Sequence, residues 1–127
     1  MKVLLDTHIF MWWNGELNRL SPAMRSICEN RENTLILSHV SIWEMQIKSQ
    51  LGKVSFHQPL SQIIESQQRD NDIELLSITT EHIYSLAQLP NYHRDPFDRL
   101  LIAQSITEGI PLLTVDSIFD RYGIKLL

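Results

Sequence analysis

The sequence has few of the features that would tie a protein to an oxidising compartment or a membrane. Its 127 residues include one cysteine, Cys28, so an internal disulfide is excluded and a zinc site has no pair of cysteines. No apolar run approaches the roughly 18 residues that a membrane-spanning helix needs. The opening segment MKVLLDTHIF has one lysine and is interrupted by Asp6, which makes it a poor signal peptide. We therefore expect a cytoplasmic protein that does not associate with membranes.

Positive charge is also scarce. The formal net charge is −4, from 11 lysines and arginines against 15 acidic residues, and there is no long basic run. This balance excludes a protein that coats nucleic acid through its overall charge. If four of the 15 acids were bound to a metal ion, the remaining 11 would balance the 11 basic residues. Any attraction for an anionic substrate should therefore be local.

Short apolar segments alternate with helical patterns along the chain, without a repeat, a low-complexity tract or a long linker. The segments expected to form buried strands are 2–5, 34–38, 73–78 and 111–115, with a fifth candidate at 124–127. Those expected to form helices are 21–30, 41–52, 59–70, 80–89 and 96–109. This alternation is typical of a parallel sheet that is covered on both faces. The sequence thus predicts one α/β domain over residues 1–127, and leaves the strand order open.

Two of the predicted helices have clear start signals. Ser21 is expected to be the N-cap of the first, with Pro22 at its first helical position. In HRDPFDRLLIAQ (93–104), Asp95 is expected to be an N-cap, with Pro96 after it and Asp98 facing the positive end of the helix dipole. The second case raises the question of whether Asp98 has a further role.

Four carboxylates are expected to meet at one edge of the predicted sheet. Parallel strands all end at the same edge, the following helices begin near it, and ligands of open α/β sheets bind there. Asp6 directly follows the first strand, and Asp116 directly follows the fourth. Glu44 lies in the opening turn of the helix after the second strand, and Asp98 in that of the helix that precedes the fourth.

Taken singly, each of these acids has an ordinary structural interpretation. Asp6 and Asp116 could be turn or cap residues, Glu44 a solvated helix residue, and Asp98 part of a helix start. Taken together, four converging carboxylates would repel one another unless a cation compensated their charge. A divalent ion that prefers oxygen ligands, Mg²⁺ or alternatively Mn²⁺, fits this set.

The segments that carry these acids resemble those of a known family. They are LLDTH (4–8), SHVSIWE (38–44), HRDPFDRLLIAQ (93–104) and LLTVD (112–116), which together extend over nearly the whole chain. The chain resembles PIN-domain proteins, and specifically the VapC-like ribonuclease toxins of bacterial toxin–antitoxin pairs. DPFDRLLIAQ is the most specific of these motifs, whereas the first and last are weak alone.

The resemblance implies a three-layer domain, with a parallel sheet of about five strands flanked by helices. It also implies Mg²⁺-dependent endonucleolytic cleavage of single-stranded RNA by water, at a site formed by Asp6, Glu44, Asp98 and Asp116. Asp6, Asp98 and Asp116 are expected to bind metal directly or through water. Glu44 would bind a second ion or orient the attacking water, and Asp95 remains a helix cap.

Several polar side chains near the acids are candidates for contacts with the RNA. Thr7 and Thr114 could donate hydrogen bonds to ligand carboxylates or to phosphate, or simply cap strand ends. The basic candidates, which could equally be solvated surface charges, are Arg94, Arg99, Lys48 and Lys53. The histidines lack the spacing of zinc ligands. His8 is a candidate general base, and His93 a candidate substrate contact.

The family also implies a protein partner. VapC-like toxins usually bind an antitoxin peptide in an apolar groove, and they are commonly homodimers, so we expect both partners here. The segment FMWW (10–13) could pack on the core as a helix, which we favour, or stack bases. Alternatively, part of FMWW or Trp43 could line that groove.

Two alternatives come from other classes of protein. A receiver-like signalling domain also gathers acids around Mg²⁺, but it needs a phosphate-accepting aspartate after its third strand. Here that strand is followed by Thr79 and Thr80, and no lysine follows the last strand as a receiver requires. A catalytically inactive interaction module is the second alternative, and the intact set of acids argues against it. Nothing in the sequence distinguishes RNA from DNA as the substrate.

Overall fold

Strands and helices alternate along the chain, as the apolar pattern predicts. The computed structural model describes residues 1–124 and 126–127. In chain order the elements are β1 (Lys2–Leu5), α1 (Thr7–Gly15), the 3₁₀ helix η1 (Leu17–Arg19), α2 (Pro22–Glu29), β2 (Thr34–Ser38), α3 (His39–Gln50), α4 (Leu60–Asn71), β3 (Glu74–Leu76), α5 (Thr80–Ser85), the 3₁₀ helix η2 (Leu86–Gln88), α6 (Pro96–Glu108), β4 (Leu112–Leu113) and the 3₁₀ helix η3 (Ser117–Tyr122). No helix in this described part of the chain is long and apolar enough to cross a membrane.

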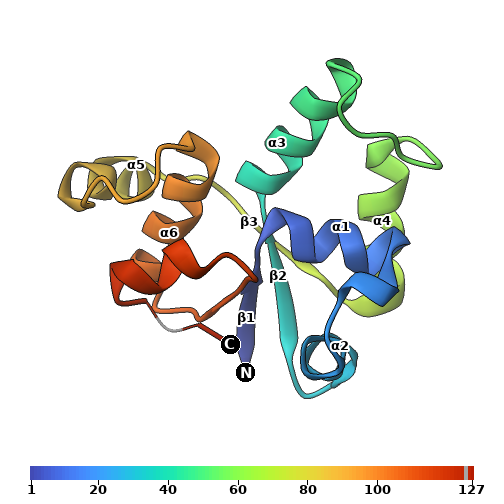
Figure 1. Cartoon of the computed structure of the whole chain (residues 1–127). Helices are drawn as coiled ribbons and strands as arrows, with labels where there is room; N and C mark the ends of the chain where they lie inside the picture. The colour runs from blue at the N-terminus through green and yellow to red at the C-terminus, as the bar shows by residue number, and fades with distance from the viewer. Residues whose placement is uncertain (125) are drawn as a thin grey trace.

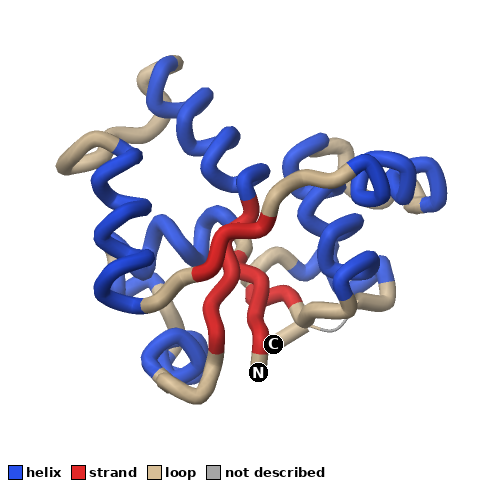
Figure 2. Tube along the Cα trace, turned by 180° about the vertical axis from the view of Figure 1, so that it is seen from behind, coloured by secondary structure: helices blue, strands red, loops and turns tan. Residues whose placement is uncertain are grey.

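The four strands form one parallel sheet in the order β3-β2-β1-β4. Seen from behind, they run between two groups of helices (Figure 2). From β1 the chain adds β2 and β3 on one side of the sheet, and then returns to place β4 on the other side of β1. The direction of winding therefore reverses between β1 and β4, and the crevice at such a reversal is the usual ligand-binding position of an open α/β sheet.

Helices cover both faces of the sheet, which confirms the predicted three-layer arrangement (Figure 1). Alternate residues of β1 point to opposite faces. Val3 and Leu5 belong to a core that they share with buried residues of α1, α2 and α4, whereas Leu4 belongs to a second core formed with α6 and η3. All three are fully buried. The central strand is thus fixed from both sides, and so is the residue that follows it, Asp6.

The start of α6 has the predicted capping arrangement. The side chain of Asp95 accepts hydrogen bonds from the backbone N–H groups of Phe97 at 2.8 Å and Asp98 at 3.3 Å. Pro96 occupies the first helical position, and Gly109 ends the helix with a φ of +65°, a conformation that glycine adopts without strain. Asp98 is therefore held in the first turn, at the rim of the sheet.

The second helix of the rim begins earlier than predicted. The hydroxyl of Ser38 accepts a hydrogen bond from the N–H of Val40 at 3.0 Å, so α3 starts at His39. Glu44 consequently lies in the second turn of α3, and the prediction of the opening turn was wrong by about one turn.

The last strands are shorter than predicted. β4 contains only Leu112 and Leu113, so Asp116 does not follow it directly but lies beyond Thr114. The predicted fifth strand is reduced, within the described residues, to a single parallel bridge between Leu112 and Leu126, and Lys125 lies outside those residues.

A buried polar contact joins the two helices that carry Glu44 and Asp98. The hydroxyl of Ser38, at the start of α3, donates a hydrogen bond to Oε1 of Gln104 in α6, and both side chains are fully buried. The Gln104 amide also donates to the carbonyl of Ser77 at 3.4 Å. Buried polar groups need such partners, because an unsatisfied one is costly. This contact therefore holds the start of α3 against the middle of α6.

Replacing Gln104 with leucine should lower the free energy of unfolding by about 1–3 kcal/mol, because the Ser38 hydroxyl and the Ser77 carbonyl would lose their buried partner. Urea unfolding monitored by circular dichroism measures this change. Gln68, an exposed residue of α4, is the matched control, and Gln68→Leu should alter stability by no more than about 0.5 kcal/mol. Equal stability of the two variants would contradict this role of Gln104.

Candidate metal centre

Two of the predicted site acids are almost completely buried. Asp6 follows β1 and is the N-cap residue of α1, with 3% of its surface exposed. Glu44, in α3, has 2% exposed. Carboxylates are rarely buried to this degree unless they are paired or bind a cation. Their hydrogen-bond partners therefore decide what the site can do.

Two threonines connect these acids to their neighbours. Thr7 donates a hydrogen bond to Oε1 of Glu44 at 2.8 Å. Thr114 donates to Oδ2 of Asp6 at 2.8 Å and accepts a hydrogen bond from the backbone N–H of Asp116 at 3.1 Å. In this structure, both predicted threonines orient carboxylates of the rim.

The other two acids meet at a histidine. Nε2 of His93 lies 2.9 Å from Oδ2 of Asp98 and 3.2 Å from Oδ2 of Asp116. One ligand atom from each of the three residues lies within 4.8 Å of the others. The first turn of α6 carries Asp98, and Asp116 caps η3. The structure thus brings the two acids together, as the sequence predicts, with an imidazole between them.

The charges at this rim interact strongly. The pKa of Asp98 is raised to about 8, first by burial and then by the negative charges of four neighbouring carboxylates: Asp6, Asp95, Glu44 and Asp116. Burial also raises the pKa of Asp6. The hydrogen bond from Thr114 lowers this pKa in part, and the charge of Glu44 raises it. The four predicted acids therefore act on one another electrostatically, and their crowding favours a bound cation.

The donor set fits a hard divalent ion. Carboxylate oxygens are the ligands that Mg²⁺ and Mn²⁺ prefer. Oδ1 of Asp6 is buried and has no hydrogen-bond partner within the described part of the chain. An unsatisfied buried carboxylate oxygen is unfavourable unless an ion or water binds it. Asp6, Asp98 and Asp116 are thus the residues that could hold such an ion.

Glu44 differs from the other three acids because a lysine already neutralises it. Nζ of Lys48, one helical turn later, lies 2.7 Å from Oε2 of Glu44. Burial tends to lower the pKa of Lys48, but the hydrogen bond and the charge of Glu44, followed by the charges of Asp95 and Asp98, raise it overall. Lys48 is thus a fixed positive charge at the edge of the acid cluster.

The other basic candidates occupy different positions. The guanidinium of Arg99 donates to backbone carbonyls of the segment before α6, the shortest contact being 2.9 Å to Pro90, so the structure uses this side chain to hold that segment. Arg94 is exposed beside His93. Lys53 is exposed and lines a groove away from the acids. Of these basic residues, Arg94 is both exposed and next along the chain to a residue that contacts two site acids.

Sequence reasoning underestimated His93. It identified this residue only as a candidate substrate contact, whereas the structure places the ring against two site acids. The signal was its position two residues before Asp95, which is close to a site acid along the chain. However, the contact with Asp116 joins residues that are 23 positions apart, and the sequence gives no indication of it.

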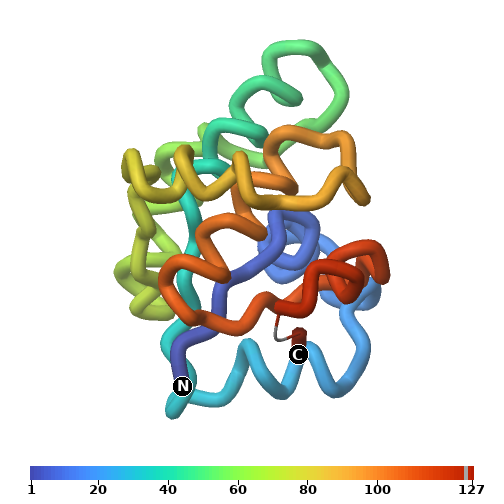
Figure 3. The backbone as a smooth tube through the Cα atoms, turned by 90° about the vertical axis from the view of Figure 1, so that its left-hand side faces the viewer, coloured from blue at the N-terminus to red at the C-terminus, as the bar shows by residue number. Residues whose placement is uncertain are grey.

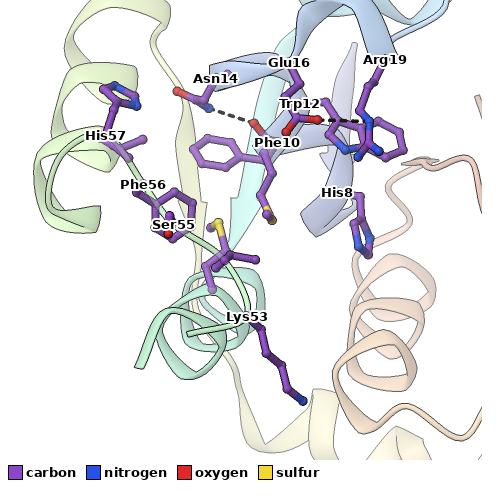
Figure 4. Close-up of a pocket in the computed structure, with 15 residues that line it drawn as sticks. His8, Phe10, Trp12, Asn14, Glu16, Arg19, Lys53, Ser55, Phe56 and His57 are labelled. Carbon is purple, nitrogen blue, oxygen red and sulfur yellow. Dashed lines mark hydrogen bonds and ion pairs between the residues drawn. The ribbon is translucent and has the colours of Figure 1, made fainter. Parts of the chain in front are cut away.

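A groove of about 590 Å³ lies beside α1, between this helix and the segment that joins α3 to α4. Phe10 and Trp12 lie on one side, while Phe56 and His57 lie across from them (Figure 4). Met11 also lines the groove. The segment FMWW therefore packs on the core as a helix, as favoured from the sequence, and also contributes to the groove. His8, the candidate general base, also lines this groove.

Trp43 does not line the groove. Its ring packs edge-to-face against Phe97 with centroids 5.0 Å apart, and 53% of its surface is exposed. Trp43 is thus outside the groove beside α1, and its place in an antitoxin-binding groove stays a prediction.

Comparison with known proteins identifies the family. The model of the PIN domain matches residues 3–125. The chain belongs to the PIN domain family. Within it, Ribonuclease VapC22 of Mycobacterium tuberculosis (strain ATCC 25618 / H37Rv) is 30% identical over 115 residues, which cover 90% of this chain and 86% of that relative.

Solved structures agree with this PIN-domain fold. VapBC2 from Rickettsia felis, bound to a DNA fragment from its promoter, aligns with a TM-score of 0.72 and 16% identity, and covers 100% of this chain and 97% of that one. DNA-bound VapBC from Salmonella typhimurium aligns with a TM-score of 0.71 and 16% identity, and covers 100% of this chain and 97% of that one. At this identity the likeness establishes the fold alone.

The raised pKa of Asp98 predicts a pH dependence of stability in the metal-free PIN domain. An aspartate in an unfolded chain has a pKa of about 3.9, and folded Asp98 has a pKa of about 8. Between these pH values the folded state retains a proton that the unfolded chain has lost. Stability should therefore fall as the pH rises through this window. Unfolding in urea with a chelator, at about pH 5 and pH 8, measures the difference.

Asp98→Asn is the variant that isolates this contribution, because asparagine is similar in size and does not titrate. Between the two pH values, the wild type should lose at least about 1 kcal/mol more stability than Asp98→Asn. An equal change in the free energy of unfolding for the two proteins would contradict the raised pKa of Asp98 in the folded state.

Proposed function

We propose that this protein is a metal-dependent endoribonuclease that hydrolyses phosphodiester bonds in RNA, and that it acts in the cytoplasm as the toxin of a toxin–antitoxin pair that inhibits translation. The observation that carries the proposal is the meeting of Asp98 and Asp116 at His93, next to Asp6, whose charge acts on Asp98 and which has a buried oxygen without a partner among the described residues. Membership of the PIN family and the likeness to Ribonuclease VapC22 support the choice of RNA as substrate.

The residues of this chain would act mainly by positioning. Asp6, Asp98 and Asp116 would hold Mg²⁺ or Mn²⁺, which supplies neutralisation of phosphate charge and activation of water. Glu44, with Thr7 on one oxygen and Lys48 on the other, would orient the attacking water or hold a second ion if Lys48 moved away. Thr114 holds one oxygen of the Asp6 carboxylate through its hydrogen bond.

Local positive charge would receive the RNA backbone. Arg94 is exposed next to His93 and close to Asp98 along the chain, so it is the preferred candidate for a contact with phosphate. Arg99 is bound to backbone carbonyls and would contribute by holding the segment that precedes α6. A net charge of −4 is consistent with RNA binding through Arg94, because only a local positive charge is needed to attract the phosphate.

The two alternative classes make different predictions. A receiver-like domain would bind Mg²⁺ at a similar rim and take up phosphate, yet no aspartate follows β3. An inactive interaction module would not need a partnerless oxygen buried among like charges. The acid cluster therefore favours a nuclease over either alternative, whereas cleavage of DNA in place of RNA would use the same residues.

Purified protein should cleave single-stranded RNA with Mg²⁺ or Mn²⁺, and should lose this activity with a chelator. Asp98→Asn should lower the rate by at least about 100-fold, because one carboxylate of the metal set is lost while the helix start is retained. Gel analysis of a labelled RNA measures both effects, and a single-stranded DNA of the same sequence tests the choice of substrate.

Asp70→Asn is the matched control, since Asp70 is an exposed acid of α4 outside the acid cluster. It should cleave at the wild-type rate. Cleavage that persists in the chelator, or in Asp98→Asn protein of normal fold, would contradict the proposed function.

We further propose that the groove beside α1 receives an apolar segment of a protein antitoxin. The named VapBC structures are complexes with such partners, and the groove offers aromatic and sulfur side chains flanked by Glu16, Arg19 and Lys53. An amphipathic peptide would bury its apolar face there while its charged groups remain at the edges. A homodimer also remains a prediction.

Phe56→Ala should weaken binding of the cognate antitoxin by at least about tenfold, because it removes an aromatic side chain from the wall of the groove. Calorimetric titration measures the affinity, and the melting temperature reports whether the variant folds. Tyr84→Ala is the control, because Tyr84 is 73% exposed on α5, on the other side of the sheet (Figure 1). Equal binding by both variants would exclude this groove.

A further inference from the structure

We propose that His93 is a positioning residue: its Nε2–H donates to the carboxylates of Asp98 and Asp116 and holds them together, and its ring is not a ligand of the metal ion. The inference rests on the proposed function in one respect, namely that these two acids hold a cation. It concerns the imidazole of His93. One nitrogen of this ring and one carboxylate oxygen from each of the two acids lie close enough together to suggest a metal site with mixed nitrogen and oxygen ligands.

The hydrogen bonds of the ring define its tautomer. The backbone N–H of Asp95 points at Nδ1 of His93, with the two nitrogens 3.2 Å apart. A backbone N–H can only donate, so Nδ1 must accept and carries no proton. In the neutral ring the proton therefore resides on Nε2, the nitrogen that faces Oδ2 of Asp98 and Oδ2 of Asp116.

This tautomer opposes direct coordination by His93. A metal-bound Nε2 would need its lone pair, and the ring proton would then have to move to Nδ1, as in most histidine ligands. A proton on Nδ1 would face the N–H of Asp95, so two donors would meet at 3.2 Å. A donor role keeps every one of these contacts favourable, and it leaves the remaining carboxylate lone pairs available to a cation.

Other contacts keep the ring in place. The backbone N–H of His93 donates to Oη of Tyr122 at 2.7 Å, and the imidazole packs against Phe119 with centroids 5.8 Å apart. Both partners belong to η3, the helix that Asp116 caps. The segment that leads into α6 and the last helix of the chain accordingly lie side by side (Figure 3). His93 thus ties together the two segments that carry Asp98 and Asp116.

Partners that orient metal-binding carboxylates contribute to affinity without touching the ion. Their removal typically costs about 10- to 100-fold in metal affinity. Without the Nε2–H, no donor from His93 would bridge Oδ2 of Asp98 and Oδ2 of Asp116, and the two side chains would be free to turn apart. The structure therefore predicts that the donor, and not the imidazole as such, is what the site requires.

The tautomer is tested first, in metal-free protein. Long-range proton–nitrogen correlation spectra of the wild type should show the proton of His93 on Nε2, with its resonances assigned from their absence in His93→Gln. His39→Gln, which removes an exposed histidine of α3, provides the matched spectrum in which those resonances persist. A proton on Nδ1 would overturn the proposal, whether or not the protein proves to cleave RNA.

The role is tested by Mn²⁺ binding, measured by calorimetry in three variants. Glutamine can place an N–H near the position of Nε2, whereas asparagine reaches only to the position of Nδ1. His93→Gln should bind Mn²⁺ within about threefold of the wild type, while His93→Asn and His93→Ala should each lose at least about tenfold. Wild-type affinity in His93→Ala would overturn the proposal, and so would an equal loss in all three variants.

Pulsed electron paramagnetic resonance of the Mn²⁺ complex separates the two roles of the ring directly. The wild type should show no hyperfine coupling from a directly coordinated nitrogen, and such a coupling that disappears in His93→Gln would make His93 a ligand and end the proposal. A protein that binds Mn²⁺ as described but cleaves no RNA would instead contradict the proposed nuclease function alone.

Discussion

The carboxylate of Asp6 is the constraint on which the rest of the rim depends. It follows the central strand, at the reversal of winding between β1 and β4, and packing on both faces of the sheet prevents it from turning to solvent. Thr114 satisfies one of its oxygens and leaves the other without a partner. Burial of an incompletely paired charge is unfavourable, and the fold accepts it at the position where open α/β sheets bind ligands.

Much of this arrangement could be predicted from sequence because it follows from local rules. Apolar segments of four or five residues gave β1 and β2 with correct bounds, and the sequence Asp-Pro-Phe-Asp gave the cap of α6 and the position of Asp98. The convergence of the acids required one further rule, that parallel strands end at the same edge. The order of the strands and the extent of β4 depend on packing between distant segments, and no local pattern determined them.

The contacts between side chains were less accessible to sequence reasoning. Arg99 was a candidate for contact with RNA or a solvated surface charge, whereas its guanidinium satisfies the carbonyls of the segment before α6. Lys48 was recognised only as a nearby charge, although its spacing of one helical turn from Glu44 is the geometry of a helical ion pair. His93 was undervalued because its second partner, Asp116, lies on another element. In each case the deciding partner became evident only in three dimensions.

Each acid of the cluster already has a positively charged or hydrogen-bond-donating partner. Lys48 neutralises Glu44, the imidazole N–H lies against Asp98 and Asp116, and a hydroxyl binds Asp6. These groups do not remove the effect of the other acids on Asp98, whose pKa is raised to about 8, first by burial and then by their negative charges. The negative charge of the acids and the partnerless oxygen of Asp6 belong to one group of side chains that act on one another electrostatically. A cation that bound there would relieve both at once, so the same crowding that weakens the metal-free fold provides the affinity for the ion.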